Sequence, residues 1–401
     1  MHQIPRIFTL KGVVQPYAWG GSDFIPQLIG QPADHAVPAA EYWLGAHPSA
    51  PAQAQIPGGP VALVDLIQQD PVGLVGETVW SRFGELPYLF KVLDVNDMLS
   101  IQVHPTKAEA EKGFDAEEAA GVPRHAPHRN YKDRNHKPEV MVALSEFWLL
   151  HGFKKAAAIE ETLLSIIEFN VFLPLYRKEG LAAFYQLLME MDQTDVNSLL
   201  MPLVKREIRR KQNGELDPHQ PGWWVAKWYE KTGLTDQIDR GIFSIYLFNI
   251  VKVEPGEAVF QKAGIPHAYL QGQNMELMAN SDNVLRGGLT PKHVDVPELM
   301  KHTLFEDTIP QVMKGQPLRE GETLYPCPVP DFGLSRIVLD GSMSYVAQAH
   351  SLEIFMVIEG GVVINQSLVA KKGEAFAVLV GEDYQLTASG KATLYKAFVP
   401  Q

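Results

Sequence analysis

Hydrophobic and polar positions divide the chain into regions of different periodicity. Up to about residue 153, short apolar runs alternate with segments rich in proline and glycine, which is typical of β-strands joined by irregular loops. Over 154–233 apolar residues recur at helical spacing. Strand character returns at 242–253, and from residue 334 onward nearly every segment alternates or is β-branched. The pattern predicts a mainly β fold with an inserted all-helical segment.

The helical segment carries one conspicuous group of cations. The stretch 196–211 places apolar residues on one face of a predicted helix. At its end lie four basic residues, Arg206, Arg209, Arg210 and Lys211. This cluster could bind a phosphate. We favour the interpretation that the four residues lie on a solvated face, where their positive charge also suits the carboxyl end of the helix.

A short internal similarity links two of the β regions. Residues 253–270 read VEPGEAVFQKAGIPHAYL and 370–386 read AKKGEAFAVLVGEDYQL, so a Gly-Glu-Ala turn occurs twice. Eleven residues after the glycine, the first copy has His267 and the second has Tyr384. Glycine-rich hairpins are common in any β protein, so the similarity alone leaves the repeat open. If it is real, two small β-barrels are related and the second has lost its ligand.

Composition and charge exclude several classes of function. The 401 residues include 46% hydrophobic and 20% charged residues, which is ordinary for a globular protein of two or three domains. Cys327 is the only cysteine, so an internal disulfide or thiolate metal cluster cannot form. The net charge of -12 argues against nucleic-acid binding, and an anionic substrate would require a local cluster of Lys and Arg.

Targeting signals are not evident in the sequence. The opening residues MHQIPRIFTLKG lack the features of a signal peptide, and no apolar stretch approaches the roughly 18 residues of a membrane span. We therefore expect a cytoplasmic protein without a membrane partner.

The first candidate metal ligands lie at the end of a predicted strand. Ile101-Gln102-Val103-His104 alternates apolar and polar residues before Pro105. Because strand side chains alternate, Gln102 and His104 point to the same face, roughly 7 Å apart at the backbone, and could share one ion. Taken alone, the pair favours the other interpretation, polar groups that face solvent or a hydrogen-bond partner, so the metal site depends on further residues.

Two further segments supply the remaining candidate ligands. In the run 135–139, Lys137 and Glu139 precede an apolar strand, and His267 lies in a proline-containing hairpin that would hold it rigidly. The upstream loop that contains Lys132 has the composition of a mobile, solvated segment. Two His, one Glu and one Gln suit a borderline divalent ion such as zinc, although manganese or iron would also be plausible.

Six segments in order resemble type I mannose-6-phosphate isomerases over essentially the whole chain. They are QPYAWGG at 15–21, LPYLFKVLD at 86–94, LSIQVHP at 99–105, NHKPE at 135–139, GIPHAY at 264–269 and MELMANSDNVLRGGLTPK at 275–292. The resemblance implies a cupin fold with two jelly-roll barrels and an inserted helical domain. It divides the chain into a metal-binding catalytic domain of 1–153 and 234–320, a helical domain of 154–233 and a C-terminal barrel of 321–401 without metal ligands.

The resemblance also implies a reaction and its residues. It places one zinc ion per chain on Gln102, His104, Glu139 and His267, and an active-site arginine at Arg286. The implied activity interconverts mannose 6-phosphate and fructose 6-phosphate, by proton transfer through a cis-enediol. Where relatives often have a cysteine before Gly-Phe, this chain has His151, and the loop 121–134 also departs from the family pattern.

The base and the phosphate ligands are less well defined by sequence. Glu276 is one candidate base, with His104 and a zinc-bound water as alternatives, and Lys137 could assist proton movement. Phosphate-binding candidates in the matched segments are Ser100, Lys91, Lys137 and Lys292. Tyr17 and Trp19 are expected in the core or at its rim, and the strand-like run 41–44 is assigned no chemistry.

Two other functions fit part of this pattern. A non-catalytic bicupin would need the ligands but not Arg286 or the lysines, and an iron-dependent cupin oxygenase would use two His and a carboxylate. The favoured hypothesis is a monomeric enzyme acting on a small sugar phosphate. The C-terminal barrel could serve to cover apolar surface of the catalytic domain, so truncation near Leu324 would impair folding.

Overall fold

The computed structural model describes residues 4–401 and contains nearly equal amounts of strand and helix, 30% and 29%. The prediction of a mainly β fold was therefore wrong in proportion, because helices also occur outside the predicted helical segment. These are α1 (Phe24–Leu28), α2 (Leu63–Gln69), α3 (Pro71–Val75), α4 (Glu77–Phe83), α5 (Lys107–Ala119), α10 (Gly241–Leu247) and α11 (Val296–His302). The strand predicted over 242–253 was therefore wrong in its first part, because α10 occupies it up to Leu247 and only β10 (Phe248–Val253) is a strand. A capping box of Thr106 and Glu109 begins α5, a sequence signal that strand periodicity obscured.

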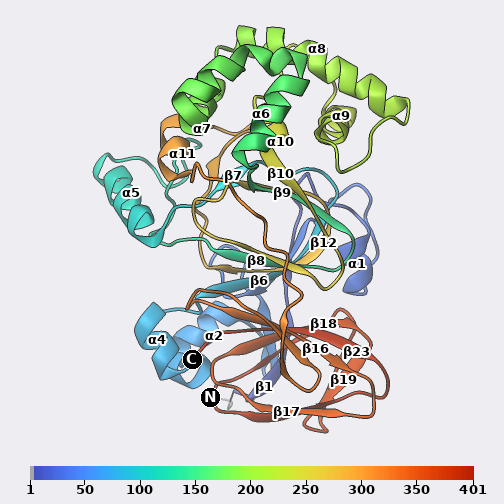
Figure 1. Ribbon diagram of the computed structural model, residues 1–401. Coiled ribbons are helices and arrows are strands. Elements are labelled where there is room, and N and C mark those ends of the chain that lie inside the picture. Colours follow the sequence, from blue (N-terminus) through green and yellow to red (C-terminus); the bar gives the residue numbers. More distant parts are fainter. Residues whose placement is uncertain (1–3) are drawn as a thin grey trace.

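A ten-stranded antiparallel sheet, here called the site sheet, forms the middle of the molecule (Figure 1). Six strands run in the order β10 (Phe248–Val253), β9 (Phe147–Phe153), β12 (His267–Ala279), β6 (Tyr88–Val95), β3 (Glu41–Gly45) and β2 (Val13–Gln15). The others are β7 (Gln102–Val103), β8 (Glu139–Ala143), β11 (Ala258–Gln261) and β13 (Leu285–Arg286). Both β7 and β8 pair with the long strand β12, which draws the distant segments of the candidate site together.

A nine-stranded sheet, here called the C-terminal sheet, lies below it (Figure 1). Its strands are β14 (Gln316–Arg319), β15 (Glu322–Tyr325), β16 (Gly333–Leu339), β23 (Ala392–Phe398), β18 (Glu353–Glu359), β21 (Ala375–Val378), β1 (Ile7–Lys11), β4 (Gln53–Ile56) and β5 (Gly59–Ala62). A four-stranded sheet of β17 (Ser344–Gln348), β22 (Asp383–Thr387), β19 (Gly361–Ile364) and β20 (Leu368–Lys371) completes this region. The N-terminal strand β1 pairs with β21, so one sheet joins both ends of the chain.

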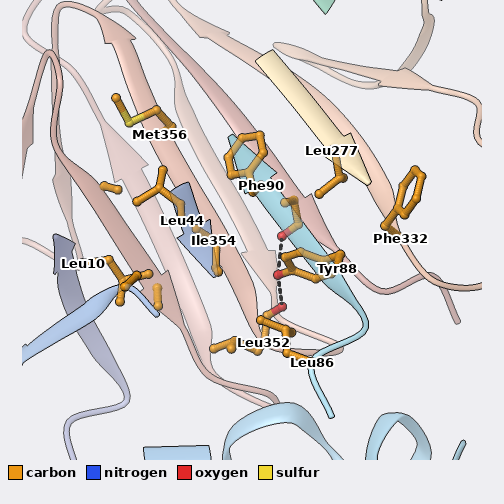
Figure 2. Close-up of a cluster of buried hydrophobic side chains, with 14 of the residues drawn as sticks. Leu10, Leu44, Leu86, Tyr88, Phe90, Leu277, Phe332, Leu352, Ile354 and Met356 are labelled. Carbon is orange, nitrogen blue, oxygen red and sulfur yellow. Dashed lines mark hydrogen bonds between the residues drawn. The ribbon is translucent and has the colours of Figure 1, made fainter. Parts of the chain in front are cut away.

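A continuous hydrophobic core lies between the site sheet and the C-terminal sheet. Alternate residues of β6, including Phe90, pack with Ile354 and Met356 of β18. The single proton of the buried Tyr88 hydroxyl is shared between the carbonyl oxygens of Leu352, at 2.9 Å, and Ala397, at 3.2 Å, which ties the two sheets together (Figure 2). The C-terminal region therefore covers apolar surface of the site sheet, as the sequence analysis suggested.

The segment between β9 and β10 is helical and caps the other side of the site sheet (Figure 1). It comprises α6 (Ala156–Ser165), η1 (Ile167–Phe172), α7 (Leu173–Glu190), α8 (Gln193–Gln212), α9 (Pro221–Thr232) and α10 (Gly241–Leu247). The basic end of α8 is ion-paired, since Arg206 contacts Glu168 at 2.6 Å and Arg210 contacts Glu207 at 2.9 Å. Among the described helices, none combines the length and apolar character needed to cross a membrane.

Candidate metal centre and substrate pocket

Three buried side chains from separate strands meet at one point of the site sheet. His104 follows β7, Glu139 begins β8 and His267 begins β12. The Nε2 atom of His104 lies 3.5 Å from one oxygen of Glu139, and Nε2 of His267 lies 3.3 Å from the other. One potential ligand atom from each residue lies within 4.8 Å of the others, so this cluster could hold a metal ion.

The orientation of both imidazole rings is fixed by backbone acceptors. Nδ1 of His104 lies 2.9 Å from the carbonyl oxygen of Asn283, and Nδ1 of His267 lies 2.9 Å from that of Ile265. Because a carbonyl can only accept, each Nδ1 carries the proton and each Nε2 presents a lone pair toward Glu139. Outer hydrogen bonds of this kind orient histidines that bind metals.

Electrostatics also favour the protonation states that a metal requires. Burial and, after it, the Lys137 ammonium lower the pKa of His104 to about 4, so the ring is neutral at pH 7. Burial raises the pKa of Glu139, but Lys137 at 2.7 Å and the two histidines more than offset this and hold it well below its usual value. The site thus presents a neutral imidazole at His104 and a carboxylate at Glu139.

Gln102 lies on the same face as this cluster. In the strand register Gln102 stands directly opposite His267 on β12 and opposite Arg286 on β13. Directly opposed residues of antiparallel strands project to the same side. The described residues provide no hydrogen-bond partner for the buried Nε2 of His104, which a divalent ion would satisfy. The donor set therefore fits a metal that prefers nitrogen and oxygen ligands.

A pocket of about 520 Å³ opens beside the cluster and gathers most of the predicted site residues. Gln102 and Lys137 line it, together with Ser100, Lys91, Arg286 and Lys292. Lys137 connects the pocket to the metal cluster through its contact with Glu139. Lys91 comes from β6, Gln102 from β7 and Arg286 from β13, so the sheet brings distant parts of the sequence together here.

Six cations line the pocket, and they differ in how their charge is balanced. Lys91, Lys137 and Lys231 form ion pairs with carboxylates. Within residues 4–401, no carboxylate pairs with the other three, which are Lys132, Arg286 and Lys292. These three are close enough that burial, then Arg286, then Lys132 lower the pKa of Lys292. Unbalanced positive charge of this kind favours an anion in the pocket.

Glu276 and Lys91 form part of a buried network beside the metal cluster. The Lys91 ammonium lies 3.2 Å from a carboxylate oxygen of Glu276 and 3.2 Å from one of Glu41. Burial raises the pKa of Glu276, Lys91 opposes this, and the nearby Glu139 raises it further, so the net shift is upward. Glu276 is 4% exposed and is not among the pocket-lining residues, whereas Glu41 and Lys91 are.

The Arg286 segment is held by the half-buried side chain of Asp239 and the buried side chain of Asn283. Asp239 accepts from the backbone of Gly241 and Leu289 at 2.7 and 2.8 Å, which fixes the turn after Arg286. Asn283 accepts at 2.7 Å from the backbone N–H of Lys132. The backbone carbonyl of Asn283 is the acceptor that orients His104. Asn283 therefore couples the metal cluster to the loop that carries Lys132.

Several pocket residues were missed by the sequence analysis. The loop containing Lys132 was interpreted as solvated, and Glu41 was assigned no chemistry, yet both line the pocket. Their roles depend on long-range strand pairing, which local patterns do not reveal. The helical segment also contributes Trp228 and Lys231 from α9, while Tyr17 and Trp19 lie at the rim with ring centroids 5.9 Å apart.

A further histidine lies next to the metal cluster. His151 stands opposite His267 in the β9–β12 register, and neither of its ring nitrogens has a hydrogen-bond partner within residues 4–401. Burial and the neighbouring His267 lower its pKa to about 4. In the sequence, the only feature that singled out His151 was its place before Gly-Phe, where relatives often have a cysteine.

The chain is similar to known proteins over most of its length. Residues 7–156 match the family model "Phosphomannose isomerase type I, catalytic domain". The chain is 38% identical to the mannose-6-phosphate isomerase of Escherichia coli over 96% of its length and 97% of the relative, and 34% identical to that of Rattus norvegicus over 89% and 88%.

Solved structures agree over the full chain. Mannose 6-phosphate isomerase from Salmonella typhimurium, bound to its substrate fructose 6-phosphate and a zinc atom, is 36% identical, with a TM-score of 0.88 over 99% of this chain and 100% of that one. A zinc-bound holo mannose 6-phosphate isomerase gives a TM-score of 0.89 at 35% identity, with the same coverage. With sequence and structure matched from end to end, this chain belongs to the type I phosphomannose isomerase family.

Proposed function

We propose that the protein interconverts mannose 6-phosphate and fructose 6-phosphate with the help of zinc. The observation that carries this proposal is a pocket with three unbalanced cations that is joined to the buried His-Glu-His cluster by Lys137, which lines the pocket and contacts Glu139. The cluster suits a metal and the cations suit the phosphate of the substrate. The related enzymes are named for this reaction, and one of them was solved with fructose 6-phosphate and zinc.

The proposed zinc ligands are Gln102, His104, Glu139 and His267, with one ion per chain. Three of them form the cluster described above, and Gln102 stands opposite His267. Zinc bound here would supply Lewis-acid stabilisation of negative charge on the sugar oxygens. The orienting carbonyls of Asn283 and Ile265 support this set, because they leave both Nε2 atoms free to bind.

The proposed reaction is a proton transfer between adjacent carbons. A base removes the proton from C2 of the aldose, the C–H electron pair forms a C1=C2 double bond, and the carbonyl oxygen gains a proton to give a cis-enediol. Return of a proton to C1 and loss of the O2 proton give the ketose. Atoms and electrons balance without an oxidant, which agrees with a site that offers bases and cations.

We assign proton abstraction to Glu276 and stabilisation of the enediolate to Arg286. Burial raises the pKa of Glu276, which strengthens it as a base, and Lys91 links it to the pocket. Arg286 has no counter-ion within residues 4–401, so its guanidinium is available to a developing oxyanion. Lys137 lies between pocket and cluster and assists proton movement between sugar oxygens.

The phosphate would bind where positive charge is unbalanced. Lys292 is the principal ligand, supported by Lys132 and by the hydroxyl of Ser100, all of which line the pocket. Lys91 is already balanced by Glu41 and Glu276, so its contact is with a sugar hydroxyl. This revises the sequence prediction, in which Lys91 was a phosphate candidate.

The proposed architecture is that of a bicupin with a helical insertion, acting as a monomer. The site sheet contributes the metal-binding barrel of 1–153 and 234–320, with the helical domain of 154–233 inserted and a second barrel at 321–401. The helices between β9 and β10 support this division. The pairing of β1 with β21 means that the N-terminal strands also belong to the second barrel.

The base assignment is tested by comparing two carboxylates that share one partner. Glu276 and Glu41 each lie 3.2 Å from the Lys91 ammonium. Glu276→Gln should lower kcat at least about 100-fold, as expected for loss of a general base, while zinc content is retained. Glu41→Gln removes the same kind of ion pair and should cause a smaller loss. Equal losses in the two variants would assign Glu276 a structural role.

A further inference from the structure

The loop that carries Lys132 is irregular, but its backbone is held by side chains of other segments. Residues 121–134 form neither helix nor strand. The backbone N–H groups of Asn130 and Tyr131 donate to the two carboxylate oxygens of Glu117 on α5, each at 2.9 Å. The next N–H, that of Lys132, donates to the side chain of Asn283 at 2.7 Å. Three successive backbone donors are therefore fixed where Lys132 leaves the chain.

The side chain of Tyr131 is buried against α5. It is 3% exposed and packs with Ala110 and Phe114. Gly113 lies directly under the ring, since a Cβ at this position would come within 2.3 Å of two ring carbons. The absence of a side chain at Gly113 thus lets the Tyr131 ring lie on the helix backbone.

The hydroxyl of Tyr131 reaches a buried network that joins α5, the loop and α11. It donates to the carboxylate of Glu298 and lies 2.5 Å from Nε2 of His302. The side chain of His302 is fully buried, with Nε2 3.0 Å from the same Glu298 oxygen and Nδ1 3.0 Å from Glu109. We call Tyr131, His302, Glu298 and Glu109 the His302 network.

The hydrogen-bond directions assign a charge to His302. Burial raises the pKa of Glu109 and of Glu298, but the hydrogen bonds that each carboxylate accepts outweigh burial and hold both values below the usual range. Both groups are therefore ionised at neutral pH and can only accept. The one proton of Tyr131 is donated to Glu298, so each nitrogen of His302 must supply its own. The ring is an imidazolium bound to two carboxylates, a strong class of hydrogen bond.

The same elements join the two lysines of the proposed phosphate site. Asp295, three residues after Lys292, begins α11 and accepts from the side chain of Asn130 at 2.8 Å. After burial and Arg286, Lys132 also contributes to the lowered pKa of Lys292, so the two ammonium groups repel each other. Keeping two repelling cations beside one pocket requires support from the surrounding structure.

We propose that Tyr131 and His302 are positioning residues, which hold Lys132 beside Lys292 so that the two ammonium groups form a preorganised site for the phosphate of the substrate. This proposal rests on the proposed function. Neither Tyr131 nor His302 lines the pocket, so both act through the loop and not on the sugar. A site assembled before binding loses less free energy than one that the ligand must order. The network should therefore affect phosphate affinity and not the proton transfer.

Two variants disturb Tyr131 in different ways. Tyr131→Phe removes the hydroxyl, whereas Gly113→Ala keeps every polar group and favours the helix but displaces the ring. In zinc-loaded protein, each should raise KM for mannose 6-phosphate and the dissociation constant of inorganic phosphate about 3- to 10-fold, less than the loss of a charged contact itself. The value of kcat should stay within about twofold. His302→Gln carries its donors on one nitrogen, cannot reach both carboxylates and should act in the same direction.

A control separates positioning from general destabilisation. Tyr88→Phe also removes a buried hydroxyl, but one that lies between the two sheets. It should lower the midpoint of urea unfolding and leave both constants unchanged. An equal rise of KM in Tyr88→Phe and Tyr131→Phe at equal loss of stability would contradict the proposal.

The deciding experiment combines Tyr131→Phe with Lys132→Met. If Tyr131 acts through Lys132, Tyr131→Phe should raise neither constant further in a protein that already carries Lys132→Met. Equal effects in both backgrounds would overturn the proposal, as would unchanged constants in both Tyr131→Phe and Gly113→Ala, or a parental protein that binds no phosphate. Absent turnover in the parental protein would instead reject the proposed reaction, and calorimetric titration with inorganic phosphate would still decide the role of the network.

Discussion

The unbalanced charge at Lys292 gives a prediction whose magnitude follows from the structure. Lys292 lines the pocket with Lys132 and Arg286, and no carboxylate within residues 4–401 pairs with it. A hydrogen bond to a charged group is worth about 1.5–3 kcal/mol, and each 1.4 kcal/mol is about tenfold in affinity. Lys292→Met should therefore raise KM for mannose 6-phosphate about 10- to 150-fold. The value of kcat should change less, because the phosphate lies away from the reacting carbons.

Lys231 provides the matched control for this variant. It also lines the pocket, but Asp97 balances its charge. Lys231→Met should change KM much less than Lys292→Met does, and the inhibition constant of inorganic phosphate should follow the same order. An unchanged KM in Lys292→Met, together with a raised KM in Lys231→Met, would refute the assignment of the phosphate site.

The lowered pKa of Lys292 also leads us to expect that KM depends on pH. Burial lowers the pKa of Lys292, and Arg286 and Lys132 lower it further. A cation with a lowered pKa loses its proton at a lower pH than an ordinary lysine, so KM should rise with pH earlier than an unperturbed lysine would allow. This alkaline rise should be absent from the KM profile of Lys292→Met. If the variant keeps the parental profile, another group is responsible.

Three further predictions concern the metal, the oxyanion and the core. Glu139→Ala or His267→Ala should release zinc and abolish turnover together, whereas full activity in either variant without zinc would contradict the ligand assignment. Arg286→Ala should lower kcat by orders of magnitude at normal zinc content, and near-normal turnover would reject its role. Tyr88→Phe removes the buried hydroxyl whose proton is shared between two carbonyls and should lower stability by about 1–3 kcal/mol in urea unfolding, with kcat unchanged.

Local sequence patterns were sufficient to find candidate metal ligands but not their neighbours. The alternation in 101–104 correctly placed Gln102 on a strand ending before His104, and the rigid hairpin carried His267. The strand pairing that brings β7 and β8 onto β12 is long-range, so Glu41 and Lys132 could not be assigned to the pocket from sequence alone.

The fold was predictable where apolar residues recur with a strong period. It was not predictable where short helices or long-range strand pairing determine the structure. Helical spacing found the segment between β9 and β10, but short helices such as α2 to α4 carry too few turns to produce a clear pattern. The pairing of β1 with β21 joins residues more than 360 positions apart, which no local pattern specifies. Whether a cation has a counter-ion is likewise decided by tertiary packing, as Lys231 and Lys292 illustrate.

The most direct test of the account is to measure zinc and isomerase activity on the same sample. The purified protein should contain one zinc per chain and form fructose 6-phosphate from mannose 6-phosphate. Chelation should remove both the metal and the activity, and added zinc should restore them. Full isomerase activity in a protein verified to contain no zinc would contradict the central claim.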